Sequence, residues 1–189
     1  MAANSLAIGA LLYPGFEMLD MLGPLEMFSI LGTDRVRRHM IAKEAGAVHA
    51  CINETPAAGP RIMADYGLQD APPLDLLLIP GGVGTLTALE DEVLLEFLRR
   101  RAADARVVAS VCTGSALLAR AGLLDGRRAT SNKQFFALAT MQSAQVDWVE
   151  MARWVEDGKF FTSSGVSAGM DMSLAIIEQL FGTDAAETV

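Results

Sequence analysis

The chain has 189 residues, of which 51% are hydrophobic and 20% are charged. This length and composition are typical of one globular domain with a substantial core, so we expect a single domain over residues 1–189. The net charge of −8 disfavours nucleic acid and anionic membranes as partners, because both repel an acidic protein.

The first predicted strand is followed by two carboxylates. Residues 6–13 form an apolar run, and Tyr13-Pro-Gly-Phe16 has the composition of a turn. Asp20 is a plausible N-cap for a helix over 21–31, and Glu17 lies in the turn itself. Ligands bind at the carboxyl ends of strands in open α/β sheets. Two interpretations of each carboxylate stay open. It is a catalytic group, or it is a helix cap or a solvated side chain without a catalytic role.

The next segments indicate strands with no chemistry of their own. Residues 36–44 and 48–53 resemble a hairpin turned at 45–47, and 61–66 is a candidate edge strand. His39 and His49 lie in or beside these strands, far in sequence from any cysteine or carboxylate cluster. We interpret both as structural or surface residues and predict no metal site.

A glycine cluster follows the predicted central strand over 74–79. Gly81 and Gly82 lie in Pro80-Gly-Gly-Val-Gly84, which allows the backbone to approach a ligand closely. The cluster lacks the spacing of a dinucleotide fingerprint and the Lys-Ser/Thr of a phosphate loop, and we expect no cofactor. The favoured role is a backbone N–H for an oxyanion hole, and a plain tight turn is the alternative.

The stretch 105–119 is the centre of the predicted site. After a helix over 90–104, residues 106–111 form a short β-branched run and 115–121 are rich in Ala and Leu. Cys112 therefore falls on a strand-to-helix turn with Thr113 and Gly114, the position of a nucleophile elbow. The start of the helix is expected to lower the pKa of this thiol, and Cys112 to be more reactive than Cys51. Alternatively, Cys112 is a small buried hydrophobe.

The rest of the chain continues the alternation of strands and helices. We expect an extended piece over 127–131, a helix over 133–141, strands over 148–154 and 159–163 around a turn at 156–159, a loop over 164–169 and a closing helix over 170–181. This order predicts an α/β three-layer sandwich around a mainly parallel sheet. In this sandwich three loops then meet at the carboxyl ends of the parallel strands. They carry Glu17 and Asp20, Gly81 and Gly82, and Cys112.

The cysteine content and the absence of two kinds of segment favour a cytoplasmic location. Two cysteines are too few for a disulfide framework, which suits a reducing compartment. The first five residues lack the basic region of a secretory signal, and no apolar run approaches the ~20 residues of a membrane span.

Five motifs in order make the sequence resemble the ThiJ/PfpI superfamily. They are Tyr13-Pro-Gly-Phe-Glu-Met-Leu-Asp-Met-Leu-Gly-Pro24, Ile79-Pro-Gly-Gly82, Ser110-Val-Cys-Thr-Gly114, Ala121-Gly-Leu-Leu-Asp-Gly-Arg-Arg-Ala-Thr130 and Thr162-Ser-Ser-Gly-Val-Ser-Ala-Gly-Met-Asp171. The resemblance runs from the first strand to the closing helix. It implies a flavodoxin-like sandwich, a homodimer, and an acidic residue beside a cysteine on a strained elbow.

Cys-Thr-Gly at the elbow and Leu-Asp in the first loop are most similar to the isocyanide hydratases. That resemblance implies Cys112 as nucleophile, Asp20 as acid/base and a backbone amide from Thr113. It also implies that Gly81 and Gly82 form a wall, and that the backbone of Val166 meets the cysteine from the opposite side. One departure is Ala129-Thr-Ser-Asn-Lys133, where the hydratases usually have Ala-Thr-Thr-His-Trp, so Asn132 is expected to reshape the pocket.

The leading hypothesis is a hydro-lyase that converts an isocyanide to an N-substituted formamide through a cysteine thioimidate. The partner would be a small electrophilic substrate. Alternatives are a glyoxalase- or amidase-like enzyme, a redox-sensing stress-response dimer that oxidises Cys112, and a ligand-binding domain like those of some transcription regulators. The sequence shows no helix-turn-helix segment, which disfavours an intact regulator.

Overall fold

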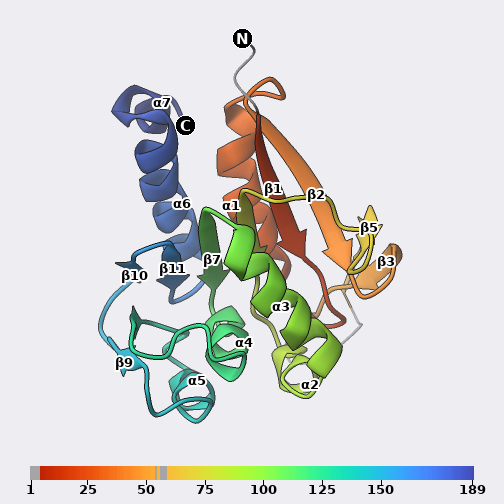
Figure 1. Ribbon diagram of the computed structural model, residues 1–189, viewed down its shortest axis with the longest axis vertical. Helices are drawn as coiled ribbons and strands as arrows, with labels where there is room; N and C mark the ends of the chain where they lie inside the picture. Colours follow the sequence, from red (N-terminus) through yellow and green to blue (C-terminus); the bar gives the residue numbers. More distant parts are fainter. Residues whose placement is uncertain (1–4, 54, 56–58) are drawn as a thin grey trace.

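A computed structural model describes residues 5–53, 55 and 59–189. Its strands are β1 (Leu6–Leu11), β2 (Val36–Ala42), β3 (Gly46–His49), β4 (Arg61–Ala64), β5 (Tyr66–Gly67), β6 (Leu76–Ile79), β7 (Val107–Val111), β8 (Arg128–Ala129), β9 (Asp147–Trp148), β10 (Trp154–Asp157) and β11 (Phe160–Ser163). Its helices are α1 (Met18–Ile30), α2 (Thr85–Ala88), α3 (Glu92–Asp104), α4 (Gly114–Arg120), α5 (Phe136–Thr140), α6 (Val166–Phe181) and α7 (Thr183–Thr188) (Figure 1).

The main sheet has seven strands in the order β10-β11-β7-β6-β1-β2-β5. Every neighbouring pair is parallel except β10 with β11. All residues of β1, β6 and β7 are buried, which explains their continuous apolar sequences, because a parallel sheet is covered on both faces. The predicted three-layer α/β fold with a mainly parallel sheet is confirmed.

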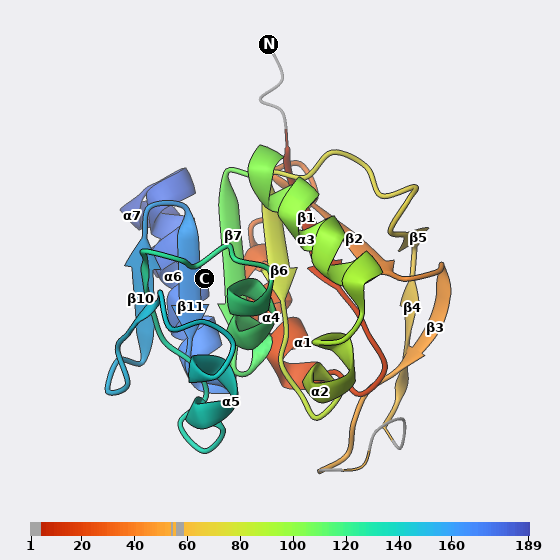
Figure 2. The same cartoon turned by 60° about the horizontal axis from the view of Figure 1, so that its bottom comes forward.

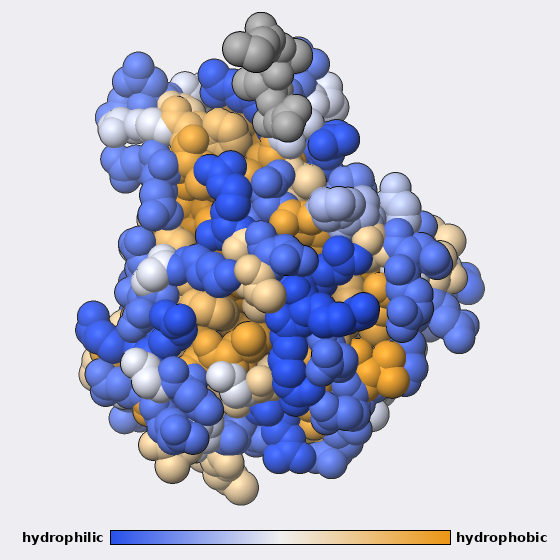
Figure 3. All heavy atoms as spheres, in the orientation of Figure 1, coloured by the Kyte–Doolittle hydropathy of each residue, from blue (hydrophilic) through white to orange (hydrophobic). Residues whose placement is uncertain are grey.

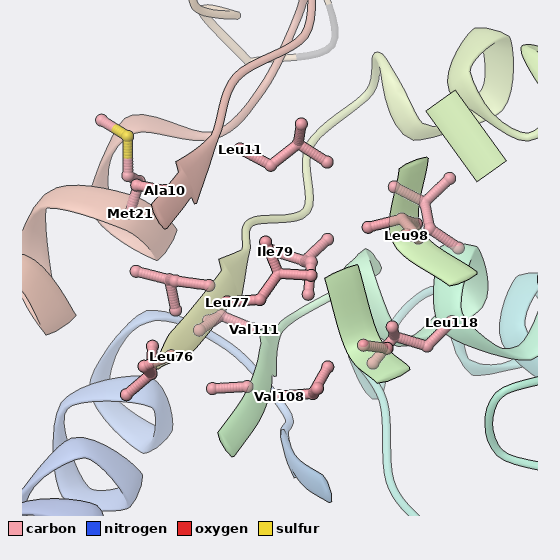
Figure 4. Close-up of a cluster of buried hydrophobic side chains, with 14 of the residues drawn as sticks. Ala10, Leu11, Met21, Leu76, Leu77, Ile79, Leu98, Val108, Val111 and Leu118 are labelled. Carbon is pink, nitrogen blue, oxygen red and sulfur yellow. The ribbon is translucent and has the colours of Figure 1, made fainter. Parts of the chain in front are cut away.

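Helices cover both faces of this sheet (Figures 1 and 2). α1 and α6 pack against each other on one face, whereas α3 and α4 are in contact on the other. The side chains between the layers are apolar, and Figure 4 shows Leu77 and Ile79 of β6 among residues from β1, β7 and the helices. Figure 3 shows hydrophilic side chains over the outward side of α3. On this helix Arg99 forms ion pairs with Glu92 and Glu96.

The predicted hairpin over 36–44 and 48–53 is wrong. β2 pairs in parallel with β1 through the α1 crossover, with Val36 opposite Leu6, and β3 instead pairs antiparallel with β4. Gly46 has a φ of 133°, a conformation that L side chains rarely adopt, at the point where the chain leaves the main sheet. The predicted edge strand over 61–66 is split between β4 in this small ribbon and β5 at the edge of the main sheet.

Several boundaries differ toward the C-terminus. The strand expected over 148–154 is two short strands separated by a turn, because β9 pairs with β8 and β10 pairs with β11. The helix expected over 133–141 is limited to α5. The predicted loop over 164–169 ends at Gly165, since α6 already begins at Val166. Within the described ranges, no helix is long and apolar enough to cross a membrane.

The topology determines where the site lies. The parallel strands run in the order β5-β2-β1-β6-β7-β11, so the chain reverses its direction of winding between β1 and β6. Such a switch point opens a crevice at the carboxyl ends of the strands. The chain passes from β1 into the Glu17–Asp20 segment, from β6 into Gly81 and Gly82, and from β7 into Cys112.

Candidate active site

Cys112 lies on a strained turn, as the elbow motif predicts. It follows β7 directly and has a φ of 59°, in the left-handed region that non-glycine residues rarely occupy. Its N–H donates to the carbonyl of Ser163 at 3.0 Å, and its carbonyl accepts from the hydroxyls of Ser115 at 3.3 Å and Ser131 at 3.2 Å. Hydrogen bonds on both sides of the residue hold the strained conformation, which presents the thiol at the end of the sheet.

Two N–H groups are directed at the Cys112 sulfur. The backbone N–H of Thr113 donates to it, as the resemblance implied. The Asn132 side chain also donates, with Nδ2 at 3.1 Å from Sγ. Both donors stabilise a thiolate more than a thiol, because hydrogen bonds to an ionised acceptor are stronger.

Asp20 is a completely buried carboxyl beside this thiol. Its relative exposure is 0%, and its Oδ2 accepts from the Gly81 N–H at 3.0 Å. Among the residues that the structure describes, the buried Oδ1 has no hydrogen-bond partner. The predicted capping role is wrong, since Glu17 is the N-cap of α1 and Asp20 lies in its first turn. Burial and the Gly81 amide, not a cap, hold this carboxyl in place.

The acid and the thiol change each other's pKa. Burial raises the pKa of Asp20 to about 7, the Gly81 N–H opposes the rise, and the negative charge of Glu17 adds to it. Burial raises the pKa of Cys112 to about 12, and the Asp20 charge adds to this rise. The expected lowering of the Cys112 pKa by the start of a helix is therefore wrong. Loss of solvent outweighs the effect of α4, which is only seven residues long.

Gly81 and Gly82 form the wall that faces the elbow. A Cβ on Gly81 would lie 2.5 Å from the Thr113 nitrogen and 2.9 Å from the Cys112 Cβ, so only glycine permits this approach. The Gly81 N–H is bonded to Asp20, and the Gly82 N–H donates to the Thr113 hydroxyl at 3.1 Å. Both amides already have protein acceptors. The sequence favoured a role for these amides as free donors to an oxyanion. In the structure they instead hold Asp20 and the Thr113 side chain in position.

A buried chain of hydroxyl groups holds the elbow against this wall. The Tyr13 hydroxyl donates to the Pro80 carbonyl at 2.6 Å, so its oxygen accepts from Thr85 at 3.1 Å. The Thr85 oxygen then accepts from the Thr113 hydroxyl at 2.8 Å. Each hydroxyl has one proton, so the first bond determines the direction of the others.

Glu17 lies at the cavity but bonds to a different cysteine. Its Oε2 accepts from the Cys51 thiol at 3.5 Å, and its Oε1 is 3.5 Å from the Leu19 nitrogen in the cap. Its own N–H donates to the Gly81 carbonyl at 2.8 Å. Glu17 therefore connects the wall to the start of α1 and influences Asp20 through its charge.

The thiol opens into a cavity of about 410 Å³. It is lined by Glu17, Cys51, Asn53, Gly82, Val83, Leu86, Cys112, Thr113, Phe135 and Leu138. Most of this lining is apolar, and Glu17, Asn53 and Thr113 contribute its polar side chains. A small electrophile with an apolar substituent matches this distribution.

Val166 is not among the lining residues that the structure describes. It begins α6, and the preceding Gly165 lies beside Asn132, since a Cβ on Gly165 would be 3.8 Å from Nδ2. The start of α6 is thus near the elbow, but the backbone contact expected between Val166 and Cys112 is left as a proposal.

Sequence reasoning missed several members of the site. Phe135 and Leu138 form one side of the cavity, and Thr85 belongs to the hydroxyl chain. Apolar residues at helical spacing are ordinarily core residues, so no signal distinguished them. Asn132 was noted as a departure from the resembled motif, but its contact with the thiol was not predicted. Within the described part of the chain, no group of three His, Cys, Asp or Glu side chains could hold a metal ion.

The chain matches a known family model and several characterised relatives. The DJ-1/PfpI family model matches residues 8–179. The chain is 38% identical to an isonitrile hydratase from Pseudomonas putida, over 98% of this chain and 76% of that protein. It is 34% identical to the HTH-type transcriptional regulator GbdR from Pseudomonas aeruginosa, over 98% of this chain but only 50% of the regulator.

A solved structure agrees with the sequence comparisons. A ThiJ/PfpI family protein from Pseudomonas syringae superposes with a TM-score of 0.83 at 34% identity, over 98% of this chain and 73% of that one. The family model covers the strands and helices that assemble the elbow, the acid and the glycine wall. The chain therefore belongs to the DJ-1/PfpI family.

Proposed function

We propose that the protein is a hydro-lyase that hydrates an isocyanide with an apolar substituent to the corresponding formamide. The observation that carries this proposal is the fully buried carboxyl of Asp20, which interacts directly with the Cys112 thiol on a nucleophile elbow. A buried carboxyl with a pKa of about 7 can both give and take a proton near neutral pH. The 38% identity to an isonitrile hydratase supports the same chemistry.

The first half of the reaction forms a thioimidate. The Cys112 thiolate bonds to the terminal isocyanide carbon, and protonated Asp20 gives its proton to that carbon. The product is a thioimidate with a C–S bond, a C–H bond and a C=N double bond, and Asp20 is left as a carboxylate. The thiolate and the acid must coexist, which the donors from Thr113 and Asn132 favour.

The second half returns the enzyme to its starting state. Water adds to the thioimidate carbon, the Asp20 carboxylate takes a proton from it, and this proton passes to nitrogen. The tetrahedral adduct collapses as the hydroxyl proton returns to Asp20. The carbonyl forms, the C–S bond breaks, and the formamide leaves behind the thiolate and the protonated acid.

The direct test is formamide production from a series of isocyanides. We expect turnover by the wild type that increases with apolar substituents fitting the cavity, and loss of turnover in Cys112→Ala. Methylglyoxal, assayed in parallel, tests the glyoxalase-like alternative. Turnover of methylglyoxal without any formamide would overturn the proposal.

A ligand-sensing domain is the second candidate, because the chain matches about half of a transcription regulator at 34% identity. A sensor would bind a small molecule in the same cavity and release it unchanged. Isothermal titration with isocyanides and their formamides, carried out beside the turnover assay, distinguishes the two.

A further inference from the structure

Asn132 is fixed in one amide orientation. Its Oδ1 accepts from the backbone N–H groups of Gln134 at 3.0 Å and Phe135 at 3.1 Å. A backbone N–H can only donate, so the atom that faces these two groups must be the oxygen. The other end of the amide is then the nitrogen, and it donates to the Cys112 sulfur at 3.1 Å.

The segment that carries Asn132 is anchored at the elbow. The preceding Ser131 is fully buried and donates to the Cys112 carbonyl at 3.2 Å. On the C-terminal side, the Asn132 Oδ1 accepts a hydrogen bond from the N–H of Phe135, and Phe135 is a residue of the cavity wall. Asn132 thus contacts the reacting atom and also holds the backbone of the pocket.

The other groups around the thiol provide little stabilisation of a negative charge. From α1, Asp20 disfavours the thiolate whenever the carboxyl is ionised. Glu17 and Cys51 lie at the same cavity, and neither is cationic. After β1, buried Tyr13 has a raised pKa and is neutral. No Lys, Arg or His is among the described residues that line the cavity. Besides the Thr113 amide and the Asp20 carboxyl when it is protonated, the donor is the neutral, non-titrating amide of Asn132.

We propose that Asn132 raises the population of the arrangement in which Cys112 is the thiolate and Asp20 carries the proton. This inference rests on the proposed nucleophilic role of Cys112 but not on the identity of the substrate. The Asn132 amide nitrogen, 3.1 Å from the sulfur, lowers the pKa of the Cys112 thiol and so opposes the rise that burial causes. Because an amide does not titrate, it gives this support at every pH without competing for the proton that Asp20 must hold.

The test is the rate of Cys112 alkylation by iodoacetamide, followed from pH 5 to 10 by peptide mass spectrometry, which separates Cys112 from Cys51. Asn132→Ser removes the donor without adding charge, and its shorter hydroxyl can still cap the turn. Asn132→Asp keeps an oxygen for both backbone N–H groups but removes the donor. Asn53→Asp, at the same cavity, is the matched control for an added negative charge. Thermal melts establish that each variant is folded.

We expect both Asn132 variants to be alkylated about 3- to 10-fold more slowly than wild type above pH 7. A hydrogen bond to a charged group changes the thiolate population by roughly 10- to 100-fold, and the higher intrinsic nucleophilicity of a more basic thiolate offsets about half of this on a logarithmic scale. In Asn132→Ser the inflection near pH 7 should stay in place, because it belongs to Asp20 and this substitution adds no charge.

A folded Asn132→Ser variant that is alkylated at the wild-type rate at every pH would overturn the proposal. If that variant does not fold, the comparison of Asn132→Asp with Asn53→Asp decides, and equal slowing of the two overturns it. Alkylation needs no substrate. Slow alkylation of both Asn132 variants beside a wild type that makes no formamide would therefore support this inference and refute the proposed function.

Discussion

At the scale of residues, the thiol of Cys112 and the carboxyl of Asp20 are coupled, since the charge of Asp20 raises the pKa of the thiol. The pKa of Asp20 is about 7 and that of Cys112 about 12. Below pH 7 both groups are protonated and the sulfur is unreactive. Above pH 7 the pair holds one proton, and the reactive arrangement, with the proton on Asp20, becomes accessible.

These protonation states of Asp20 and Cys112 predict the pH dependence of the proposed reaction. We expect kcat/KM to rise about tenfold per pH unit below pH 7 and to level above it, because the free enzyme must first lose one proton. Initial rates of formamide production at subsaturating isocyanide measure this profile. A rate that falls as the pH rises through 7 would contradict the assignment.

The two carboxylates near the thiol should respond differently to substitution. Asp20→Asn is expected to lower turnover by about 10²–10⁴-fold, since it removes the acid/base. It should also speed the alkylation of Cys112 at pH 8, because loss of the neighbouring charge lowers the pKa of the thiol. Glu17→Gln, which alters a carboxylate bonded to Cys51, should retain most turnover. If Glu17→Gln lost turnover while Asp20→Asn kept it, Glu17 and not Asp20 would be the acid/base.

At the scale of elements, the site depends on how closely the loop after β6 approaches the turn after β7. β6 and β7 are adjacent parallel strands, with Ile79 opposite Ser110 at their carboxyl ends. The short connection from each strand to its helix then brings Gly81 against Thr113. The same loop donates an N–H to Asp20, so one turn positions the acid and the elbow together.

Gly81→Ala should therefore impair turnover while leaving the rest of the fold intact. The added Cβ would lie 2.5 Å from the Thr113 nitrogen, so the loop must move away from the elbow and carry the Gly81 N–H away from Asp20. A displacement of about 1 Å in a catalytic group costs on the order of 10²-fold in rate. Gly67→Ala is the control, because its nearest contact would be an ordinary 3.6 Å. Equal kinetics for the two variants would show that the close approach is dispensable.

At the scale of the whole molecule, α1 presents apolar side chains to solvent. Leu19 is 52% exposed, Leu22 38% and Ile30 47%, although the opposite face of the helix packs into the core. These residues recur at helical spacing, so they lie along one stripe. Because α1 also contains Asp20, the stripe is on the same element as the proposed acid.

This stripe supports the expectation of a homodimer. Light scattering at micromolar concentration should report about twice the mass of one chain, and Leu22→Glu should shift the protein toward the monomer by placing charge in a buried contact. Val93→Glu, at a 50% exposed position of α3 on the other face of the sheet, is the matched control and should leave the mass unchanged. A wild type that is monomeric under these conditions contradicts the expectation.

Much of the fold could be predicted from local sequence patterns. The β-branched and apolar runs of β1, β6 and β7 identify buried parallel strands, because such strands are covered on both faces. Cys112 was placed on the turn by the change from a strand-like to a helix-like composition, and its φ of 59° confirms the strained elbow. The glycines after β6 indicated a close approach of the backbone to a ligand, whereas the structure shows Gly81 closely packed against the elbow of the same chain.

Only the tertiary structure decided how these elements are paired and what their side chains experience. Parallel pairing depends on crossovers, so β3 could not be assigned to β4 from the nearby strand patterns. The pKa of Cys112 depends on burial and on a carboxyl 92 residues earlier, so the sequence predicted the opposite direction. The contact between Asn132 and that thiol joins residues 20 positions apart through a loop. The sequence by itself determined which chemical groups are present, whereas folding determined their partners, because desolvation and hydrogen bonding act through space.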